Sequence, residues 1–465
     1  MNFEESLHYM EGLMRFGWKL GNERFEALCA RLGNPQDRYT VLHVAGTKGK
    51  GSTTALAAGI LQAAGYKVGA YFSPYVYDPR ERVQVNGQLI PRDDFARLVT
   101  QIRPHVEALA ETELGQTTEF ELKTALGFCY FAEQNVDFAC IEVGLGGRLD
   151  ATNVVKPVVC VITNIGLDHV QQLGDTHALI AAEKAGIIKN GIPCLTAAEN
   201  PEALEVIQRI AAERNAPLLQ VQRGDVSGPT GNNNSVHWNL ARCTQDSTNS
   251  DCVNHEQSAP LTVATASHLY EDLPLNLGGL YQRANAACAV AAVEIALQAK
   301  GSLLSEEAVR QGVAHTTLPG RLEIVRVPNG PLVVLDGAHN AMAAEALVGP
   351  VRALIASHHI ERVFLVIGML TGHAPEGILA SLAPLANCIF VCQPGWKRAQ
   401  PVEELAAVAR TFSSSVVVIP SVPDAVHAAI ATASANDMVL ITGSFYTVGE
   451  APITQFAPRP PTLGE

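Results

Sequence analysis

HVAGTKGKGS, residues 43–52, is the most informative segment of this chain. A β-branched run, Tyr39–Ala45, leads into its glycines, and an alanine-rich stretch of helical composition, Ser52–Ala64, follows them. A glycine loop between a strand and a helix lets backbone N–H groups turn toward an anion, and the helix N-terminus adds a favourable dipole. The segment therefore predicts a phosphate-binding loop, with an ordinary turn as the alternative.

Two side chains of this loop carry the chemistry of such a site. Lys50 would reach the phosphates, and the Ser52 hydroxyl would ligate Mg²⁺. The spacing departs from the GxxxxGK[ST] pattern, because Gly51 separates the lysine from the serine. The strand–loop–helix context favours the phosphate loop over the turn.

Strand-like and helical stretches alternate on the C-terminal side of the loop. The strand-like runs are Lys67–Phe72, Val136–Val143 and Val158–Ile165, and apolar residues over Leu122–Ala132 recur at helical spacing. This alternation predicts a mostly parallel sheet covered by helices on both faces.

The alternation is interrupted and then resumes as a second series. Residues 223–265 are polar and rich in turn formers, which predicts short antiparallel strands or a mobile excursion. Helical spacing returns over Gln282–Ala299, and Thr317–Arg321 has the composition of a connector. The later strands are expected at Leu332–Leu335, Val363–Ile367, Val416–Ile419 and Met438–Thr442, and the later helices at 341–356, 402–411 and 424–433. We predict an α/β fold with two domains, 1–315 and 316–465.

Composition limits the kinds of partner. The chain has 465 residues, 47% hydrophobic and 17% charged, which excludes global disorder. Its 33 basic and 46 acidic side chains give a net charge of −13, which argues against nucleic acid or an anionic membrane as the main partner. An anionic small substrate would then need a locally positive pocket.

Compartment signals are consistent with a cytoplasmic protein. No apolar run reaches the ~18–20 residues that span a bilayer, and the N-terminus lacks the features of a signal peptide. The ten cysteines are dispersed and form no CxxC pair, so we expect free thiols in a reducing cytoplasm.

A second cluster, Glu142–Asn153, reads EVGLGGRLDATN. Glu142 ends an apolar strand-like run, where ligand sites of parallel sheets lie, and a carboxylate there suits Mg²⁺. A salt bridge is the alternative role for this carboxylate. Ser73 and the pair Asp168-His169 follow two other predicted strands, so these side chains are further metal-ligand candidates.

The order of the motifs resembles one superfamily. The motifs are AGTKGKGST, FSPY, ERVQVNG, TEFE, EVGLGGRLDATN, ITNIGLDH, AAEKAGI, QRANA, PGR and DGAHN. They resemble the Mur ligase superfamily and, within it, the folylpolyglutamate synthases, more closely the bifunctional bacterial form with dihydrofolate synthase activity. The resemblance implies a P-loop-containing, Mur-ligase-like domain with a mostly parallel sheet and a smaller Rossmann-like α/β domain at the C-terminus.

The resemblance also implies an activity. ATP would phosphorylate the carboxylate of dihydropteroate or a reduced folate, and the amine of L-glutamate would attack the acyl phosphate, with release of ADP and phosphate. Two Mg²⁺ ions are the expected cofactors, and a monovalent cation such as K⁺ is a further candidate. We expect a monomer. The alternatives are another ligase of the superfamily that acts on a different carboxylate, and a nucleotide-binding switch without ligase activity.

The resemblance assigns residues to the nucleotide and the metal. The nucleotide set is Thr47, Lys48, Gly49, Lys50, Gly51, Ser52, Asn285, Arg321 and Asp336. The metal set is Ser73, Glu142, His169 and Ser52. The expected catalytic residues are Lys50, Lys184, Asp336 and His339, and Lys184 matches a lysine that is carbamylated in relatives.

Two further sets follow from the resemblance. The pterin or folate set is Leu20, Gly21, Asn22, Thr118, Glu119, Phe120, Glu121, Leu149, Asp150 and Ala151. The glutamate pair is His339 and Ser444. Thr118 and Glu121 also have the spacing of a helix capping box, a role compatible with binding. The chain departs from the family pattern at Tyr75, where histidine is usual, and at Gly372-His373, where an Asp-Lys-Asp-type segment is expected.

Overall fold

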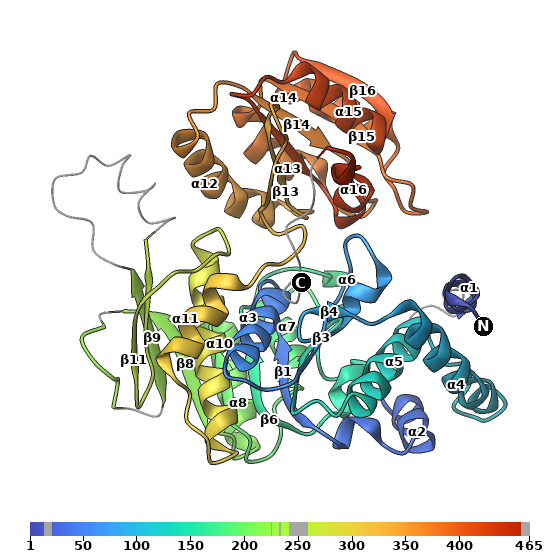
Figure 1. The fold of residues 1–465 in the computed structure, drawn as a ribbon, viewed down its shortest axis with the longest axis vertical. Coiled ribbons are helices and arrows are strands. Elements are labelled where there is room, and N and C mark those ends of the chain that lie inside the picture. Colours follow the sequence, from blue (N-terminus) through green and yellow to red (C-terminus); the bar gives the residue numbers. More distant parts are fainter. Residues whose placement is uncertain (14–20, 225, 232–233, 241–258, 457–465) are drawn as a thin grey trace.

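The computed structural model describes the chain except residues 14–20, 225, 232–233, 241–258 and 457–465. The described strands form two separate sheets, and Figure 1 shows them as two bodies joined by the segment between helix α11 (Glu306–His315) and strand β12 (Glu323–Arg326). Within the described residues, no helix is long and apolar enough to cross a membrane. The described cysteines are free thiols, most of them buried.

The larger sheet is built around the strand that leads into the glycine loop. From edge to edge its strands are β11 (Leu269–Leu273), β10 (Leu261–Ala264), β9 (Ser235–Leu240), β8 (Leu218–Arg223), β7 (Cys194–Thr196), β6 (Pro157–Ile162), β1 (Thr40–Ala45), β5 (Phe138–Glu142), β2 (Val68–Tyr71), β3 (Val83–Val85) and β4 (Gln88–Leu89). The strands from β9 to β2 pair in parallel, and the two edges are antiparallel. β1 and β5 are apolar and buried because helices cover both faces of the sheet.

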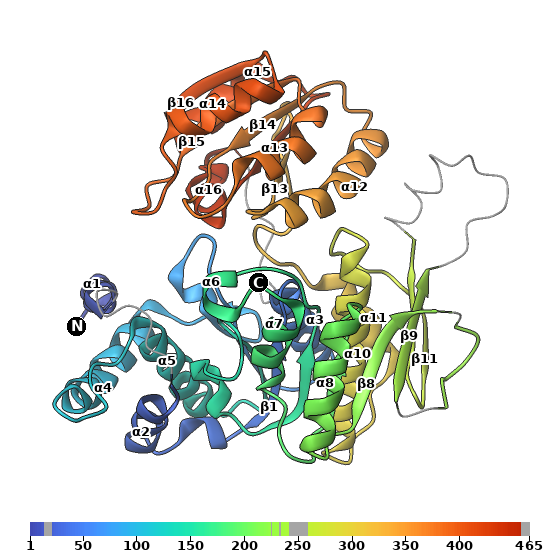
Figure 2. The ribbon, with the colours of Figure 1, turned by 180° about the vertical axis from the view of Figure 1, so that it is seen from behind.

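Helices pack on both faces of this sheet. The described helices of this part of the chain are α1 (Phe3–Leu13), α2 (Glu23–Arg31), α3 (Lys50–Ala63), α4 (Arg92–Ala110), α5 (Glu119–Glu133), α6 (Val170–Leu173), α7 (His177–Ala185), α8 (Pro201–Glu213), α10 (Tyr281–Gln298) and α11 (Glu306–His315). α3 packs against α10 and α11 in one core, whereas α7 and α8 form another with β6. Figure 1 shows α10 and α11 in front, and Figure 2, from behind, shows α8 in front.

The smaller sheet follows the connector. Its strands, in spatial order, are β12 (Glu323–Arg326), β13 (Leu332–Leu335), β17 (Met438–Thr442), β14 (Val363–Ile367), β15 (Cys388–Gln393) and β16 (Val416–Ser421), parallel except for the β12–β13 pair. Its helices are α12 (Ala341–Ser357), α13 (Pro375–Leu382), α14 (Val402–Phe412), α15 (Val422–Thr432) and α16 (Phe445–Glu450). Separate cores lie on the two faces of the sheet.

The α/β class and the strand–helix alternation are confirmed. The polar stretch 223–265 contains antiparallel β9 and β10, as predicted, while residues 241–258 lie outside the described residues. The second series also contains two strands, β12 and β15, and two helices, α13 and α16, that were not predicted.

Candidate active site

The glycine loop connects β1 to α3, and its glycines are required by close approach. Gly46 has φ +150°, and a Cβ there would lie 1.8 Å from Thr163 Oγ1. Gly49 has φ +85°, and a Cβ there would lie 2.2 Å from Asn285 Oδ1. Only glycine accommodates both the backbone angle of Gly49 and the contact that it makes. The loop is therefore held between two neighbouring segments, and Asn285 of α10 lies directly against it.

Three lysine side chains converge on this loop. Lys50 Nζ donates to the carbonyls of Gly46 and Thr47, at 3.1 and 3.4 Å. Lys184, from α7, donates to the same Gly46 carbonyl at 2.9 Å, and Lys48 Nζ lies 2.9 Å from Asp168 Oδ2. Burial lowers the pKa of all three, with that of Lys184 reduced to about 7. An anion entering here would relieve the repulsion among these ammonium groups, so the loop suits a phosphate chain.

A buried carboxylate lies beside the loop. Glu142, at the end of β5, accepts a hydrogen bond from the backbone N–H of Ser73 at 2.8 Å. Burial raises the pKa of Glu142, and Lys50 opposes this shift. Ser73 Oγ is buried with no hydrogen-bond partner among the described residues. An unpaired hydroxyl next to a buried carboxylate fits oxygen ligation of a divalent cation.

His169 and Ser52 complete the predicted metal set. His169 precedes α6 in the left-handed conformation, with φ +52°, and its side chain is half exposed. Its Nε2 lies 4.0 Å from Asp168 Oδ1, and burial and the nearby Lys50 lower its pKa. Ser52 is buried in the first turn of α3. The described part of the chain contains no group of three or more His, Cys, Asp or Glu that could hold a metal ion, so a metal here would also need hydroxyl, phosphate or water ligands.

The predicted pterin segments meet in one wall. Phe120 packs on Gly144, where a Cβ would lie 2.4 Å from the Phe120 ring and 3.0 Å from Asp150 Oδ2. Asp150 Oδ2 accepts the backbone N–H of Leu145 at 2.9 Å. Asn22 Nδ2 donates to the Arg148 carbonyl at 3.2 Å, while its Oδ1 is buried without a partner among the described residues. The buried Asn22 oxygen therefore has unused capacity to accept a hydrogen bond.

Other members of the pterin set have structural contacts. Thr118 and Glu121 form the capping box of α5, and Glu121 also pairs with Arg24 at 2.8 Å. Glu119 pairs with Lys123 one turn along the helix. The remaining members are Gly21, which precedes α2 with φ +123°, Leu149, and buried Ala151; Leu20 lies outside the described residues.

The C-terminal domain brings further predicted residues to the cleft. The Arg321 guanidinium lies over the Phe445 ring, 4.3 Å from its centroid. Asp336 is buried and accepts the backbone N–H groups of Leu322 and Ala338, both at 2.9 Å. Asp336 therefore holds the backbone of the connector in place next to Arg321.

The predicted glutamate pair lies in the same domain. Lys48 Nζ is 3.2 Å from His339 Nε2, a contact that joins the two domains. The His339 Nδ1 atom is 2.9 Å from the Gly337 carbonyl. Burial and Lys48 lower the pKa of His339 to about 3, so the imidazole is neutral near pH 7. Ser444 Oγ accepts the backbone N–H of Thr447 at 3.0 Å as the N-cap of α16, so much of its hydrogen-bonding capacity is used internally.

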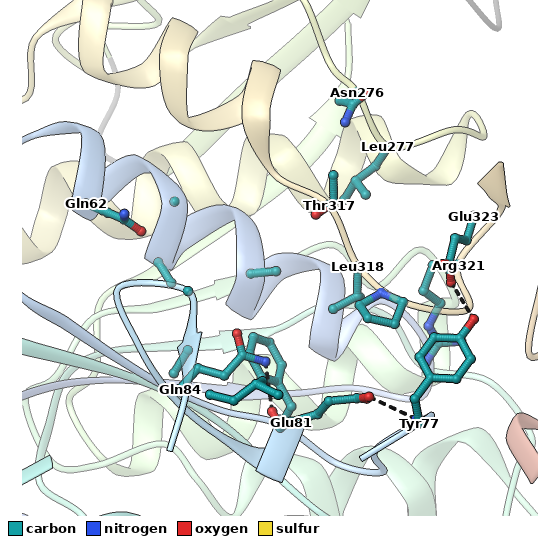
Figure 3. A pocket seen from close by; sticks show the side chains of 18 of the residues that line it. Gln62, Tyr77, Glu81, Gln84, Asn276, Leu277, Thr317, Leu318, Arg321 and Glu323 are labelled. Carbon is teal, nitrogen blue, oxygen red and sulfur yellow. Dashed lines mark hydrogen bonds between the residues drawn. The ribbon is translucent and has the colours of Figure 1, made fainter. Parts of the chain in front are cut away.

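A cavity of about 570 Å³ lies between α3, the β2–β4 edge and the connector (Figure 3). Arg321, Leu318 and Glu81 line it and also border a smaller hollow of about 30 Å³ that contains Gly51, Ser73 and Glu142. The predicted metal pair therefore borders an open space at the domain junction. In Figure 3, Tyr77 and Glu323 close one side of the larger cavity through a hydrogen bond of 2.7 Å between the domains.

Several residues around the loop were not predicted as site residues. Asn164 Oδ1 accepts the Lys48 backbone N–H at 2.7 Å, and Thr163 Oγ1 donates to the Lys48 carbonyl at 2.6 Å. Both belong to the ITNIGLDH motif, so the motif could have indicated them as site residues. His373 lies 5.3 Å from His339, ring centroid to ring centroid, and nothing in its local sequence indicates this contact.

Comparison with known proteins decides the family. The Mur ligase middle domain family matches residues 44–293, and the Mur ligase glutamate ligase domain family matches residues 320–445. The dihydrofolate synthase/folylpolyglutamate synthase of Bacillus subtilis is 38% identical over 96% of this chain and 98% of its own. The chain belongs to the dihydrofolate synthase/folylpolyglutamate synthase family of Mur ligases.

Solved structures of this family match the whole architecture. Escherichia coli FolC in complex with DHPP and ADP is 35% identical, with a TM-score of 0.80 over 97% of this chain and 96% of that one. The Yersinia pestis bifunctional folylpolyglutamate synthase/dihydrofolate synthase, complexed with AMPPNP and a Mn ion, is 29% identical, with a TM-score of 0.78 over 98% of each chain. The predicted family and its two-part α/β architecture are confirmed.

Proposed function

We propose that this protein joins L-glutamate to the carboxylate of dihydropteroate and of reduced folates, with ATP converted to ADP and phosphate. ATP-dependent glutamate ligation to folate-type substrates is the activity of its family. The observation that carries the proposal is the convergence of Lys48, Lys50 and Lys184 on a glycine loop that lies beside the buried Glu142–Ser73 pair. In a chain of net charge −13, this is the locally positive pocket that an anionic substrate needs.

The nucleotide would lie on this loop. Backbone N–H groups of residues 49–52 and the Lys50 ammonium would offset the charge of the transferring phosphoryl group. Asn285, Arg321 and Asp336 are the proposed contacts from the cleft walls. The substrate carboxylate takes the phosphoryl group and becomes an acyl phosphate, which the glutamate amine attacks. Because an acyl phosphate also reacts with water, closure of the two domains over the cleft protects it.

A divalent cation would lie at Glu142 and Ser73, near the Ser52 hydroxyl. It would supply charge neutralisation at the phosphates. We propose Mg²⁺ as this cation, a second Mg²⁺ near His169 and the modified Lys184, and K⁺ as a further candidate. The support is the orphan Ser73 hydroxyl and the buried charge of Glu142.

Replacement of Glu142 by glutamine tests the metal assignment. The change keeps the size and removes the charge, so we expect turnover to fall by on the order of a hundredfold and to recover only in part at high Mg²⁺. Titration of ADP release against Mg²⁺ gives the measurement. An unchanged Mg²⁺ dependence would show that Glu142 has a structural role, holding the Ser73 N–H.

The pterin would lie against the wall of Phe120, Asn22 and Asp150, with Gly21, Leu149 and Ala151 beside it. Thr118, Glu119 and Glu121 would support this wall through the capping box and the Arg24 and Lys123 pairs. His339 and Ser444 would face the incoming L-glutamate. We also propose a monomer, a cytoplasmic location in line with the free thiols, and a domain boundary at 315/316, between the end of α11 and the start of β12.

A substrate panel tests the function. With ATP and L-glutamate present, we expect products one glutamate heavier from dihydropteroate and from a reduced folate, detected by mass, together with stoichiometric ADP. Product from the folate alone would indicate a monofunctional folylpolyglutamate synthase. Glutamate-dependent ADP release with neither acceptor, but with another carboxylate, would indicate a different ligase of the superfamily. ATP turnover that ignores L-glutamate would indicate a switch.

A further inference from the structure

On the glutamate side of the cleft, the Arg321 guanidinium packs on the Phe445 ring and is assigned to the nucleotide. His339 and His373 face each other there, 5.3 Å apart between ring centroids. Burial lowers the pKa of both imidazoles, that of His339 to about 3, so neither is a cation near pH 7. Lys48 is close, but its ammonium already pairs with Asp168 at 2.9 Å. An incoming L-glutamate has two carboxylates, and it needs a further cation.

Arg398 supplies a cation at this place. It lies in the loop after β15 and is exposed. Its Nη2 lies 3.5 Å from the Thr371 carbonyl, and a Cβ on Gly372 would lie 3.6 Å from the same nitrogen. Its guanidinium is therefore next to the Gly372-His373 segment. Among the described residues it has no carboxylate partner within ion-pair distance, so its charge is available to a ligand.

The loop that carries Arg398 is fixed to the loop that carries His373. The Thr371 N–H donates to the Arg398 carbonyl at 2.7 Å, and the Gln400 N–H donates to the Met369 carbonyl at 2.9 Å. An antiparallel bridge joins Leu370 to Ala399. Two loops held together in this way keep the guanidinium beside His373. The segment 369–373 itself contains no lysine or arginine, although the family resemblance leads one to expect a lysine there.

We propose that Arg398 binds a carboxylate of the incoming L-glutamate and so sets the specificity for this amino acid. The inference rests on the proposed ligase function. An exposed arginine loses less hydration than a buried one would, and its planar guanidinium matches a carboxylate in a bidentate pair. Because His339 and His373 are neutral, they would donate or accept single hydrogen bonds, while Arg398 provides the charge.

Steady-state kinetics of Arg398→Ala test this assignment. With ATP and dihydropteroate saturating, we expect the KM for L-glutamate to rise about tenfold to a hundredfold, as for loss of a charged hydrogen bond. The KM for ATP should stay within about twofold, because Arg398 does not contact the glycine loop. Lys397→Ala, which removes the same charge from the next exposed residue, is the matched control and should leave the KM for L-glutamate unchanged.

Two competitors identify which carboxylate of L-glutamate Arg398 binds. L-Glutamine and L-isoglutamine each lack one carboxylate of glutamate, and each is measured as an inhibitor of ligation by the unsubstituted protein and by Arg398→Ala. The amide that lacks the carboxylate bound by Arg398 should have the same inhibition constant with both proteins. The amide that retains this carboxylate should have a higher inhibition constant with Arg398→Ala. Equal rises for both amides, or an unchanged KM for L-glutamate, would overturn the assignment. Absence of any glutamate-dependent product from the unsubstituted protein would instead overturn the proposed function, and the inference with it.

Discussion

We expect Lys50→Ala to lower ligase turnover by on the order of a thousandfold, because it removes the cation that we propose for the transferring phosphoryl group. The loss should appear in kcat for ADP release. The variant should still fold, since α3 is held by its packing on α10 and α11 and not by this side chain. Only the hydrogen bonds from Nζ to the Gly46 and Thr47 carbonyls are removed, so we expect the thermal midpoint to fall by no more than about 2–4 °C.

Lys156→Ala is the matched control for this prediction. Its ammonium is largely exposed and pairs with Asp37 at the surface, far along the chain from the loop. The Lys156→Ala substitution removes one lysine charge outside the site, so turnover should be normal. Turnover of Lys50→Ala within a few-fold of the unsubstituted protein would remove the phosphate role from this lysine.

Lys184→Ala is the second large effect, on the order of a hundredfold or more in kcat. We propose that this lysine is carbamylated, and the structure provides a suitable amine. Burial, together with Lys50, lowers its pKa to about 7, so the neutral amine that adds CO₂ is far more populated near neutral pH than in an ordinary lysine. The resulting carbamate is an anion on a long side chain, close to the loop.

Chemical rescue decides the charge of the missing group. A short-chain carboxylate should restore part of the activity of Lys184→Ala if the functional group is a carbamate, whereas an alkylamine should do so if it is an ammonium. Rescue by amine only, with no extra mass on Lys184 in the intact protein, would reject the carbamate.

The pH dependence gives a second test of the same residue. In unsubstituted protein freed of CO₂, recovery of activity at a fixed CO₂ concentration should be slow below pH 7, where the ammonium dominates, and should accelerate as the pH rises through about 7. An ordinary lysine with its usual pKa would keep accelerating to much higher pH. A recovery rate independent of CO₂ would also contradict the modification.

Much of the fold was predictable, because its signals are local. The strands at Leu332–Leu335, Val363–Ile367 and Met438–Thr442 agree with the structure to the residue, since each is a short apolar run between turns. β15 had the same signal in the apolar run Cys388–Cys392, which was not used. Thr118 and Glu121 form the predicted capping box because its two hydrogen bonds depend only on a spacing of three residues.

The candidate site was predictable only in its parts. Glycine loops and strand-end carboxylates indicate chemistry from sequence alone, so the sequence predicts Lys50 and Glu142 as site residues. Ser444 caps α16 through a local contact with Thr447, three residues on, whereas the contact between Glu142 and Ser73 joins the ends of two strands far apart in the chain.

The sequence by itself determined the family, the strand–helix order and the glycine loop, because these depend on residues close together in the chain. Only the tertiary structure decided which distant groups meet. Lys184 reaches the loop from α7, Lys48 of the loop meets His339 of the other domain, and Arg398 lies beside His373 through a pairing of two loops. These contacts join residues far apart in the chain. Their positions follow from sheet order and domain packing, which no local pattern encodes.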